Sequence, residues 1–365
     1  MATTIDRIAA LESQAPGGEP RIEPYLGEGL DYLRQQGVDY GDLRQMVTTR
    51  QTLQIKNREV ESFDESVDAG FGVRVLVDGA WGFAASATRD ADSARRAVDQ
   101  AIQVARASAM TLRHRATLSE EPVHRAHFAS PVIEDPFLVP LDEKLQYLFG
   151  LQDLLPGDPR ITAARTNFSA HRFEKQFVST EGAAISQNIT GCGAGIEVIT
   201  AKDGEFQRRS FPASFGGDLA NRGYEHVRVL RLHEHCERVR REALELLEAP
   251  KMPAGKHDLV LMPNQMMLQV HESVGHPVEL DRVYGDEISL AGGSFAQPHL
   301  LNHFQYASPL VSIVLDGTIP GGLGCYGFDD EGVQTCKEDI IRDGIFVGYL
   351  KSRETAAKLG PGHHA

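Results

Sequence analysis

The chain has 365 residues, and its 51 acidic against 37 basic residues give a formal net charge of -14. This balance argues against nucleic acid as the main partner, because proteins that bind phosphates usually present a basic face. With 41% hydrophobic and 24% charged residues, the composition is that of a globular protein, and a wholly disordered chain is excluded. No run of 18 apolar residues is present, which argues against a membrane-spanning helix.

An N-terminal α/β domain with antiparallel strands is expected over residues 21–118, after a loose leader over residues 1–20. Asp78-Gly79 lies between two apolar stretches and indicates a β-hairpin. Alanines at helical spacing between Asp90 and Met110 predict a helix that packs on this sheet. The expected elements, in chain order, are a helix over 24–36, strands over 47–55, 71–77 and 80–84, and a helix over 90–110.

A strand-rich middle block is expected over residues 119–250, ending in a long charged helix. Its first part, 119–138, contains three prolines and is expected to be a linker. Pro250, Pro253 and Gly255 end the long helix and mark the clearest domain boundary in the chain. The expected elements of this block are a helix over 141–155, strands over 161–173, 175–179, 184–189 and 193–202, and a helix over 224–247.

The last segment, residues 251–365, is expected to begin with a short buried strand over 257–262. A helix that carries Met267, Leu268 and Val274 follows Pro263. The whole pattern predicts the α+β class. It consists of an N-terminal α/β domain, a strand-rich middle block and a β-rich C-terminal catalytic domain with a metal-binding helix.

The predicted helix after Pro263 carries the strongest chemical motif of the chain, His271-Glu272-Ser273-Val274-Gly275-His276. Neutral imidazoles are common zinc ligands, and a catalytic zinc keeps one position open for water. A carboxylate beside such ligands can accept the proton of that water as a general base. His271 and His276 are therefore candidate Zn²⁺ ligands, and Glu272 is the candidate catalytic residue.

The two histidines stand at i and i+5, which places them about 140° apart on an ideal α-helix. One metal ion cannot bind both side chains in that arrangement. The sequence therefore predicts either a π-type turn at the motif or a helix that ends near Gly275. Pro277 favours the second possibility, because the residue before a proline is disfavoured in the α region. From spacing alone, a solvated His271 and a His276 that caps carbonyls remain an alternative.

Several stretches besides this motif resemble the TldD/PmbA family of metalloproteases. The motif region resembles the family's HExxGH segment, which is followed three residues on by Glu279. The other matches keep the family's order along the chain and extend to its end. They are Gly72–Ala84, Pro253–Leu261, the Asp-Asp-Glu-Gly segment within Phe328–Gly332, and Val347–Arg353.

The resemblance implies a cytoplasmic zinc peptidase of the TldD type. In the family the two histidines of the motif bind the metal, and the glutamate after the first histidine is the catalytic base. Its substrates are unfolded or leader-bearing peptides, held as an added β-strand. The resemblance also implies a dimer, either of two copies of this chain or with a PmbA-like paralogue. The scattered cysteines and the absence of a secretory pattern in Met1–Ala10 also favour a cytoplasmic setting.

The third zinc ligand of the family is a Cys well downstream of the Asp-Asp-Glu-Gly segment. Neither Cys325 nor Cys336 stands at that place, so we expect this ligand beyond Ala365 and a catalytic domain truncated at its C-terminus. On this expectation the alternative function is a non-catalytic peptide-binding or regulatory subunit with an incomplete metal site. A modulator of nucleic-acid function is a third interpretation, which the net charge disfavours.

Five further carboxylates are candidates for orienting the metal ligands through hydrogen bonds without contacting the metal. For each of them an alternative role remains open. Glu279 and Asp281 are such candidates, or else a solvated acid pair. Asp329, Asp330 and Glu331 are candidates through the resemblance, or else form a turn before Gly332.

Other cysteines and histidines give weaker candidates. His233 and Cys236 share a face of the charged helix and could bind a metal, although solvated side chains are the simpler interpretation. Cys325 or Cys336 could substitute for the missing ligand.

Overall fold

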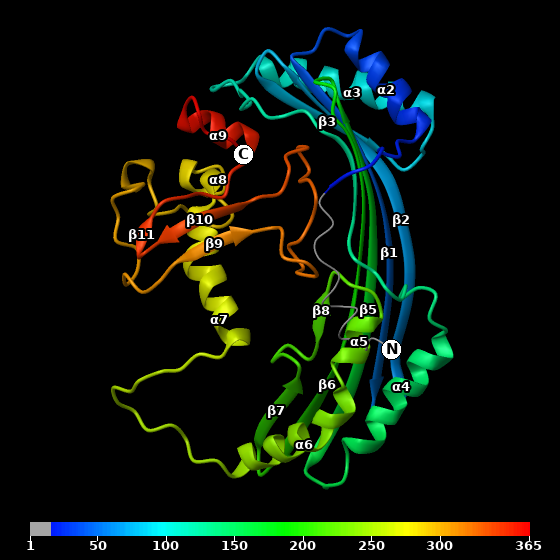
Figure 1. Ribbon diagram of the computed structural model, residues 1–365, viewed down its shortest axis with the longest axis vertical. Coiled ribbons are helices and arrows are strands. Elements are labelled where there is room, and N and C mark those ends of the chain that lie inside the picture. Colours follow the sequence, from blue (N-terminus) through cyan, green and yellow to red (C-terminus); the bar gives the residue numbers. More distant parts are fainter. Residues whose placement is uncertain (1–15) are drawn as a thin grey trace.

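The computed structural model describes residues 16–365. Residues 1–15 of the expected leader lie outside the described residues. An eight-stranded sheet dominates the molecule, with the central strand order β3-β2-β1-β5-β6-β4 and with β7 and β8 also paired to β6 (Figure 1). The α+β prediction is confirmed. The strands are β1 (Tyr40–Lys56), β2 (Glu59–Val77), β3 (Ala80–Ser86), β4 (Arg125–Ala129), β5 (Ile161–Ser179), β6 (Ala184–Lys202), β7 (Glu205–Phe211) and β8 (Asp218–Ala220).

The four longest strands pair antiparallel along almost their whole length, and β4 joins β6 in parallel. The sheet crosses the boundary predicted at residue 118, because β1 of the first block pairs with β5 of the middle block. The predicted breaks within β5 and β6 are wrong. Polar residues such as Glu174 interrupt the apolar pattern, but the backbone ladder continues through them.

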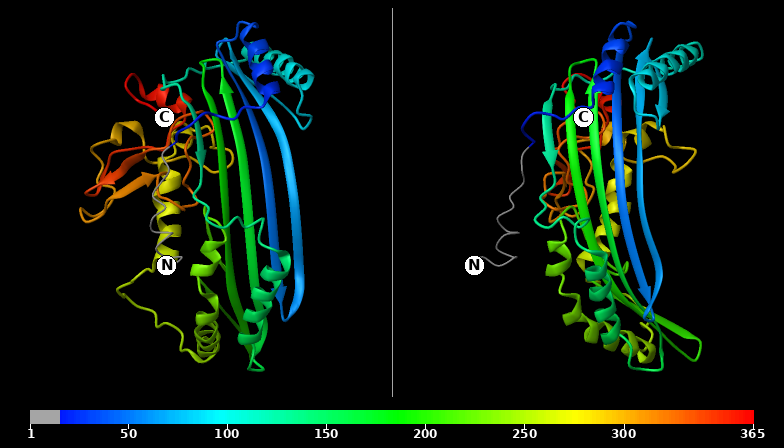
Figure 2. Two further views of the ribbon diagram at one scale, coloured as in Figure 1. Left: turned by 45° about the vertical axis from the view of Figure 1, so that its right-hand side comes forward. Right: turned by 90° about the vertical axis from the view of Figure 1, so that its right-hand side faces the viewer.

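Helices cover one face of the sheet in two groups. At one end, α2 (Pro24–Arg34) and α3 (Ala91–Ala109) bury leucines and alanines against Leu43, Val73 and Val75. At the other end lie α4 (Leu141–Leu154), α5 (Glu225–Val229) and α6 (Leu232–Glu248), which form a second core with Phe168, Ile196 and Val198. The two ends are visible at the top and bottom of Figure 2.

The long helix predicted over 224–247 is divided into α5 and α6. Arg231 lies in the left-handed region, with φ 46° and ψ 45°, and redirects the chain between the two helices. The helix predictions for 24–36, 90–110 and 141–155 are confirmed within a few residues.

The C-terminal region, residues 251–365, covers the opposite face of the sheet (Figure 1). Its small sheet has the order β11-β10-β9, and its apolar core includes Val278, Leu280, Ile341 and Phe346. The elements are α7 (Pro263–Val270), α8 (Leu280–Tyr284), β9 (Ile313–Asp316), β10 (Lys337–Arg342), β11 (Ile345–Phe346) and α9 (Arg353–Leu359).

The buried strand predicted over 257–262 is wrong. This segment is extended chain without a strand partner among the described residues, and Leu259 and Val260 are 79% and 87% exposed. An apolar run without a neighbouring strand has no backbone ladder to join, which is why the hydrophobic pattern did not give a strand. Among residues 16–365, no helix combines the length and apolar character needed to cross a membrane.

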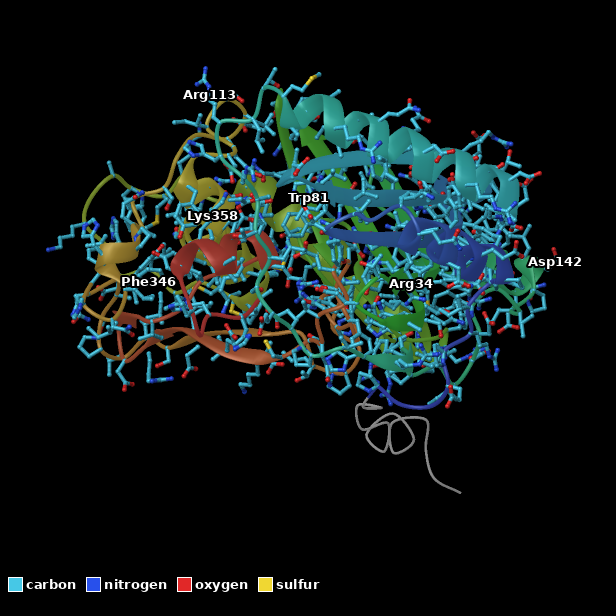
Figure 3. The ribbon with its side chains drawn as sticks, turned by 90° about the horizontal axis from the view of Figure 1, so that it is seen from above. Arg34, Trp81, Arg113, Asp142, Phe346 and Lys358 are labelled. Carbon is cyan, nitrogen blue, oxygen red and sulfur yellow. The ribbon has the colours of Figure 1, made fainter. Side chains whose placement is uncertain are left out.

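Buried polar contacts attach the C-terminal region to the sheet. The Arg353 guanidinium donates to the carbonyl of Ser119 and pairs with Glu181 at 2.8 Å. Gln187 of β6 donates to the carbonyl of Phe328 at 2.8 Å. Trp81 donates its ring N–H to Glu354 at 2.9 Å, and Figure 3 shows it between the helical side and the C-terminal region.

Candidate metal centre

The candidate metal centre lies where α7 changes its helical geometry. Pro263 begins this helix at a position where no backbone N–H is needed. His271–Gly275 then forms a π-turn, in which the N–H of His276 donates to the carbonyl of His271. The predicted π-type turn is therefore confirmed. Short π segments are frequent at functional sites, and this one brings side chains at i and i+5 to the same side of the helix.

Pro277 favoured a helix that ends near Gly275, with His276 outside the α region. The π-turn does end at Gly275, but the second part of this prediction is wrong. His276 keeps α-region angles, with φ -58° and ψ -46°, and a short 3₁₀ turn over His276–Val278 follows. Pro277 is tolerated because it occupies the start of that new turn, where its missing N–H costs no hydrogen bond.

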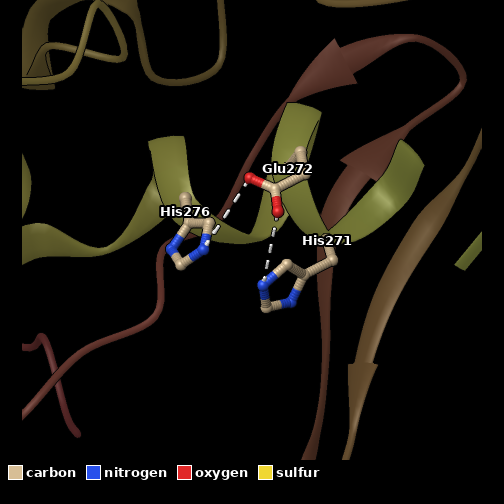
Figure 4. Close-up of side chains that lie close together, drawn as sticks. All are labelled: His271, Glu272 and His276. Carbon is tan, nitrogen blue, oxygen red and sulfur yellow. Dashed lines mark ion pairs between the residues drawn. The ribbon is translucent and has the colours of Figure 1, made fainter. Parts of the chain in front are cut away.

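The π-turn brings the three predicted site residues together (Figure 4). The imidazole rings of His271 and His276 lie 4.4 Å apart, centre to centre. The Glu272 carboxylate lies between them, with its two oxygens each 4.0 Å from one Nε2 atom. One ligand atom from each residue lies within 4.8 Å of the others.

The apolar side of the same segment fixes its position. Val274 and Val278 are 7% and 1% exposed and pack in the C-terminal core. Backbone bonds join the segment to Leu350, which donates to the carbonyl of Val278 and accepts from the N–H of Leu280. The Tyr306 hydroxyl donates to the carbonyl of Ser273 at 2.6 Å, within the π-turn itself.

The Nδ1 atom of His276 lies 3.3 Å from Glu279 and 3.2 Å from the Arg282 guanidinium. A Glu279 carboxylate that accepts from Nδ1–H leaves the lone pair of Nε2 for a metal, the arrangement usual for histidine ligands. Arg282 also pairs with Glu279 at 3.4 Å. Asp281 instead accepts from the backbone N–H of Arg282 at 2.8 Å.

Arg282 and Tyr306 are site residues that the sequence did not identify. The only signal for Arg282 is its spacing of three residues after Glu279, which suits an ion pair on one helical turn. Tyr306 carries no local signal, because its contact with Ser273 depends on the tertiary fold.

The Asp-Asp-Glu-Gly segment contacts the large sheet. Asp329 accepts from the backbone N–H groups of Glu331 and Val333, as in the turn named as the alternative. Asp330 pairs with Lys175 at 3.1 Å, and Glu331 pairs with Arg74 at 3.1 Å. Burial is the main cause that raises the pKa of Asp329. These contacts give the segment a part in holding the C-terminal region on the sheet.

The weaker metal candidates do not join the cluster. His271, Glu272 and His276 form the one group of potential ligands found within residues 16–365. Cys236 is buried on α6, where burial raises the pKa of its thiol to about 11. Cys325 packs against the sheet with Phe128 and Ile189, and Cys336 is exposed.

The donor set suits a borderline metal such as zinc. Two imidazole nitrogens and a carboxylate converge on a side of the helix where His271 and Glu272 are 59% and 67% exposed. A catalytic zinc commonly uses three protein ligands, and two histidines supply two of them. The residues present therefore fit a zinc ion, with Glu272 placed either to complete the set or to act on a bound water.

Comparison with family models defines the class of protein. The PmbA/TldA metallopeptidase domain 1 matches residues 41–105, the central domain matches residues 134–248, and the C-terminal domain matches residues 254–364. These matches define the class of protein as that of the metallopeptidases. The chain belongs to the PmbA/TldD family.

Relatives from other organisms have corresponding names. The chain is 28% identical over 332 residues to a metalloprotease of Methanocaldococcus jannaschii, covering 91% of this chain and 70% of that protein. It is 30% identical over 339 residues to a metalloprotease of Synechocystis, covering 89% and 67%. A protein of Haemophilus influenzae named metalloprotease TldD homolog is 25% identical, with coverage of 91% and 67%.

Solved structures share the fold. A candidate modulator of DNA gyrase from Thermotoga maritima matches with a TM-score of 0.72 at 19% identity, covering 92% of this chain and 72% of that chain. TldE from Thermococcus kodakarensis matches with a TM-score of 0.63 at 16% identity, covering 91% and 71%.

Proposed function

We propose that the chain is a zinc peptidase that acts on unfolded or leader-bearing peptides held in an extended conformation. The observation that carries this proposal is the π-turn, which places two imidazoles and a carboxylate on one side of a helix. A peptidase that reads the peptide backbone as an added strand makes few demands on sequence but requires an unfolded segment.

His271 and His276 would hold the zinc ion, which supplies an activated water and polarises the peptide carbonyl. Glu272 has both carboxylate oxygens 4.0 Å from the imidazoles, so it is placed to accept a proton from the attacking water. It would then return the proton to the leaving amine. We assign Glu279 the role of orienting His276 by accepting from Nδ1–H, and the Arg282 guanidinium forms an ion pair with Glu279 at 3.4 Å.

The test combines zinc content with cleavage of an unstructured peptide by the full chain and by Glu272→Gln. We expect the variant to retain zinc but to cleave at least about 100-fold more slowly, the usual size of general-base catalysis. Asp258→Asn is a matched control, because Asp258 is exposed in the extended segment before α7. If Glu272→Gln cleaved the peptide as fast as the unsubstituted chain, Glu272 would not be the general base. If the chain held no zinc, the metal assignment would be wrong.

The alternative function is a non-catalytic peptide-binding or regulatory subunit. It is favoured by the ligand count, because residues 16–365 supply two imidazoles and no cysteine at the cluster. Peptide binding without hydrolysis, in a zinc-loaded sample, would select this alternative.

We further propose that the chain works in the cytoplasm as a dimer, with a second copy or with a PmbA-like paralogue. All four cysteines are free, as expected for a reducing compartment. Sedimentation of the chain alone and with the paralogue would separate the two kinds of dimer.

A further inference from the structure

A cavity, which we call the interface cavity, lies between the large sheet and the loop Gly317–Thr335 of the C-terminal region. Its volume is about 420 Å³. Phe173 and Ile189 line it from β5 and β6, and Leu323 and Tyr326 line it from the loop. Ligand sites often occur at such junctions between regions, with mostly apolar walls and a few polar groups.

Asn221, another residue that lines the interface cavity, supplies its polar anchor. This side chain is 3% exposed, and its Nδ2 donates to the carbonyls of Gly322, Leu323 and Cys325 at 3.0, 3.2 and 3.3 Å. These contacts identify the amide nitrogen of Asn221, because the nitrogen can donate to carbonyls and the amide oxygen cannot. Oδ1 consequently faces the Nε2 atom of His171, at 3.2 Å.

This network determines the state of the His171 ring. Because Asn221 Oδ1 can only accept, Nε2 of His171 must carry the proton, and Nδ1 is an acceptor. Among the described residues, Nδ1 forms no hydrogen bond. It is also not one of the side-chain atoms that are fully buried and lack a partner. Burial lowers the pKa of His171, which keeps the ring neutral near pH 7.

Neighbouring residues hold the ring in place. His171 stacks on Phe173 with ring centres 4.7 Å apart and an angle of 29° between the planes. A Cβ atom at the facing Gly191 would lie 2.6 Å from His171 Cε1, so the ring requires glycine there. Lys175, which also lines the cavity, pairs with the 67% exposed Asp330 at 3.1 Å.

We propose that the interface cavity binds an aromatic side chain with one hydrogen-bond donor, tryptophan or tyrosine, presented by an unfolded peptide. The apolar walls take the ring, and Nδ1 of His171 accepts its N–H or O–H. This inference rests on the proposed function, because the peptide is the substrate of the metal centre. Asp329 and Asp330 also line the cavity, and their carboxylates disfavour an anionic ligand.

The test measures binding of N-acetyl-tryptophanamide and N-acetyl-phenylalaninamide to the full chain by ligand-observed NMR. The Glu272→Gln background is used, so binding is measured independently of hydrolysis. We expect the tryptophan amide to bind about 3- to 10-fold more tightly, the contribution of one neutral hydrogen bond. In His171→Phe this preference should disappear, while the phenylalanine amide should bind as before.

Leu323→Ala gives a second test that leaves His171 unchanged. Leu323 is 57% exposed, so its truncation removes part of the cavity wall without affecting the core. Both amides should bind more weakly to it, and Leu310→Ala, at a 95% exposed site, is the control. Absence of binding, equal affinity of the wild-type cavity for both amides, or no effect of Leu323→Ala would overturn the proposal. Absence of peptide hydrolysis by the unsubstituted, zinc-loaded chain, with intact amide binding, would instead overturn only the proposed function.

Discussion

The sheet region, residues 16–250, and the C-terminal region, residues 251–365, differ in how they bury apolar surface. The sheet region contains four strands of 17 to 19 residues and two large apolar clusters. The C-terminal region has strands of two to six residues, and Leu290 and Leu310 are 88% and 95% exposed. The turn that carries the candidate metal ligands thus lies on the region with the smaller core, and its position is fixed by contacts within that region, to Leu350 and Tyr306.

The largest expected effect is a loss of stability in one region that leaves the core of the other region folded. Phe346→Ala should destabilise the C-terminal region by about 3–5 kcal/mol, because the side chain is fully buried beside Tyr349. Phe168→Ala should destabilise the sheet region by a similar amount. Hydrogen exchange read by mass spectrometry should show each loss confined mainly to its own region, with zinc binding lost in Phe346→Ala. Loss of protection throughout the molecule in both variants would instead mean one cooperative unit.

The next effect concerns the attachment of the two regions. Arg353→Met leaves the Ser119 carbonyl and Glu181 without their donor, at a guanidinium whose side chain is 4% exposed. We expect a loss of about 2–4 kcal/mol and faster proteolysis of the 249–262 segment. Arg342→Met is the control, because its pair with Asp339 is at the surface, with the arginine 64% exposed. Equal proteolysis of the two variants would show that Arg353 does not attach the regions.

A smaller effect is expected within the π-turn. Tyr306→Phe removes the hydroxyl that donates to the Ser273 carbonyl, a bond worth about 1 kcal/mol. We expect weaker zinc binding by a few-fold and an unchanged stability of the sheet region. Tyr284→Phe, on α8 of the same region, is a matched control. Zinc affinity equal in the two variants would mean that the turn keeps its shape without this bond.

The same contrast explains what the sequence could predict. The hairpin at Asp78-Gly79 and the helix over 90–110 follow from local spacing, and the structure has both. A π-turn was one of the two predicted ways to bring His271 and His276 together, although Pro277 favoured the other, a helix end near Gly275. These features depend on residues close to each other in the chain.

Features that depend on distant residues were missed. The continuity of β5 and β6 depends on pairing with neighbouring strands, which overrides local interruptions such as Glu174. The segment 257–262 has the composition of a strand, but no strand lies beside it among the described residues. Tyr306 reaches Ser273 only after the C-terminal region has folded, so no local pattern identifies it.

The smallest expected effect is a pH dependence that originates in the sheet region. Burial holds the pKa of His171 below its usual value, so the native ring resists protonation while the unfolded ring accepts a proton near pH 6.5. Below that pH the unfolded state binds more protons, and stability falls with falling pH until the native ring is also protonated. Denaturant unfolding between pH 7.5 and 5.5, a window of about one unit either side of the usual histidine pKa, should show this slope. The slope should decrease in His171→Phe. An unchanged slope would mean that other groups cause the pH dependence. It would also contradict the neutral His171 ring, with Nδ1 as acceptor, on which the proposal for the interface cavity depends.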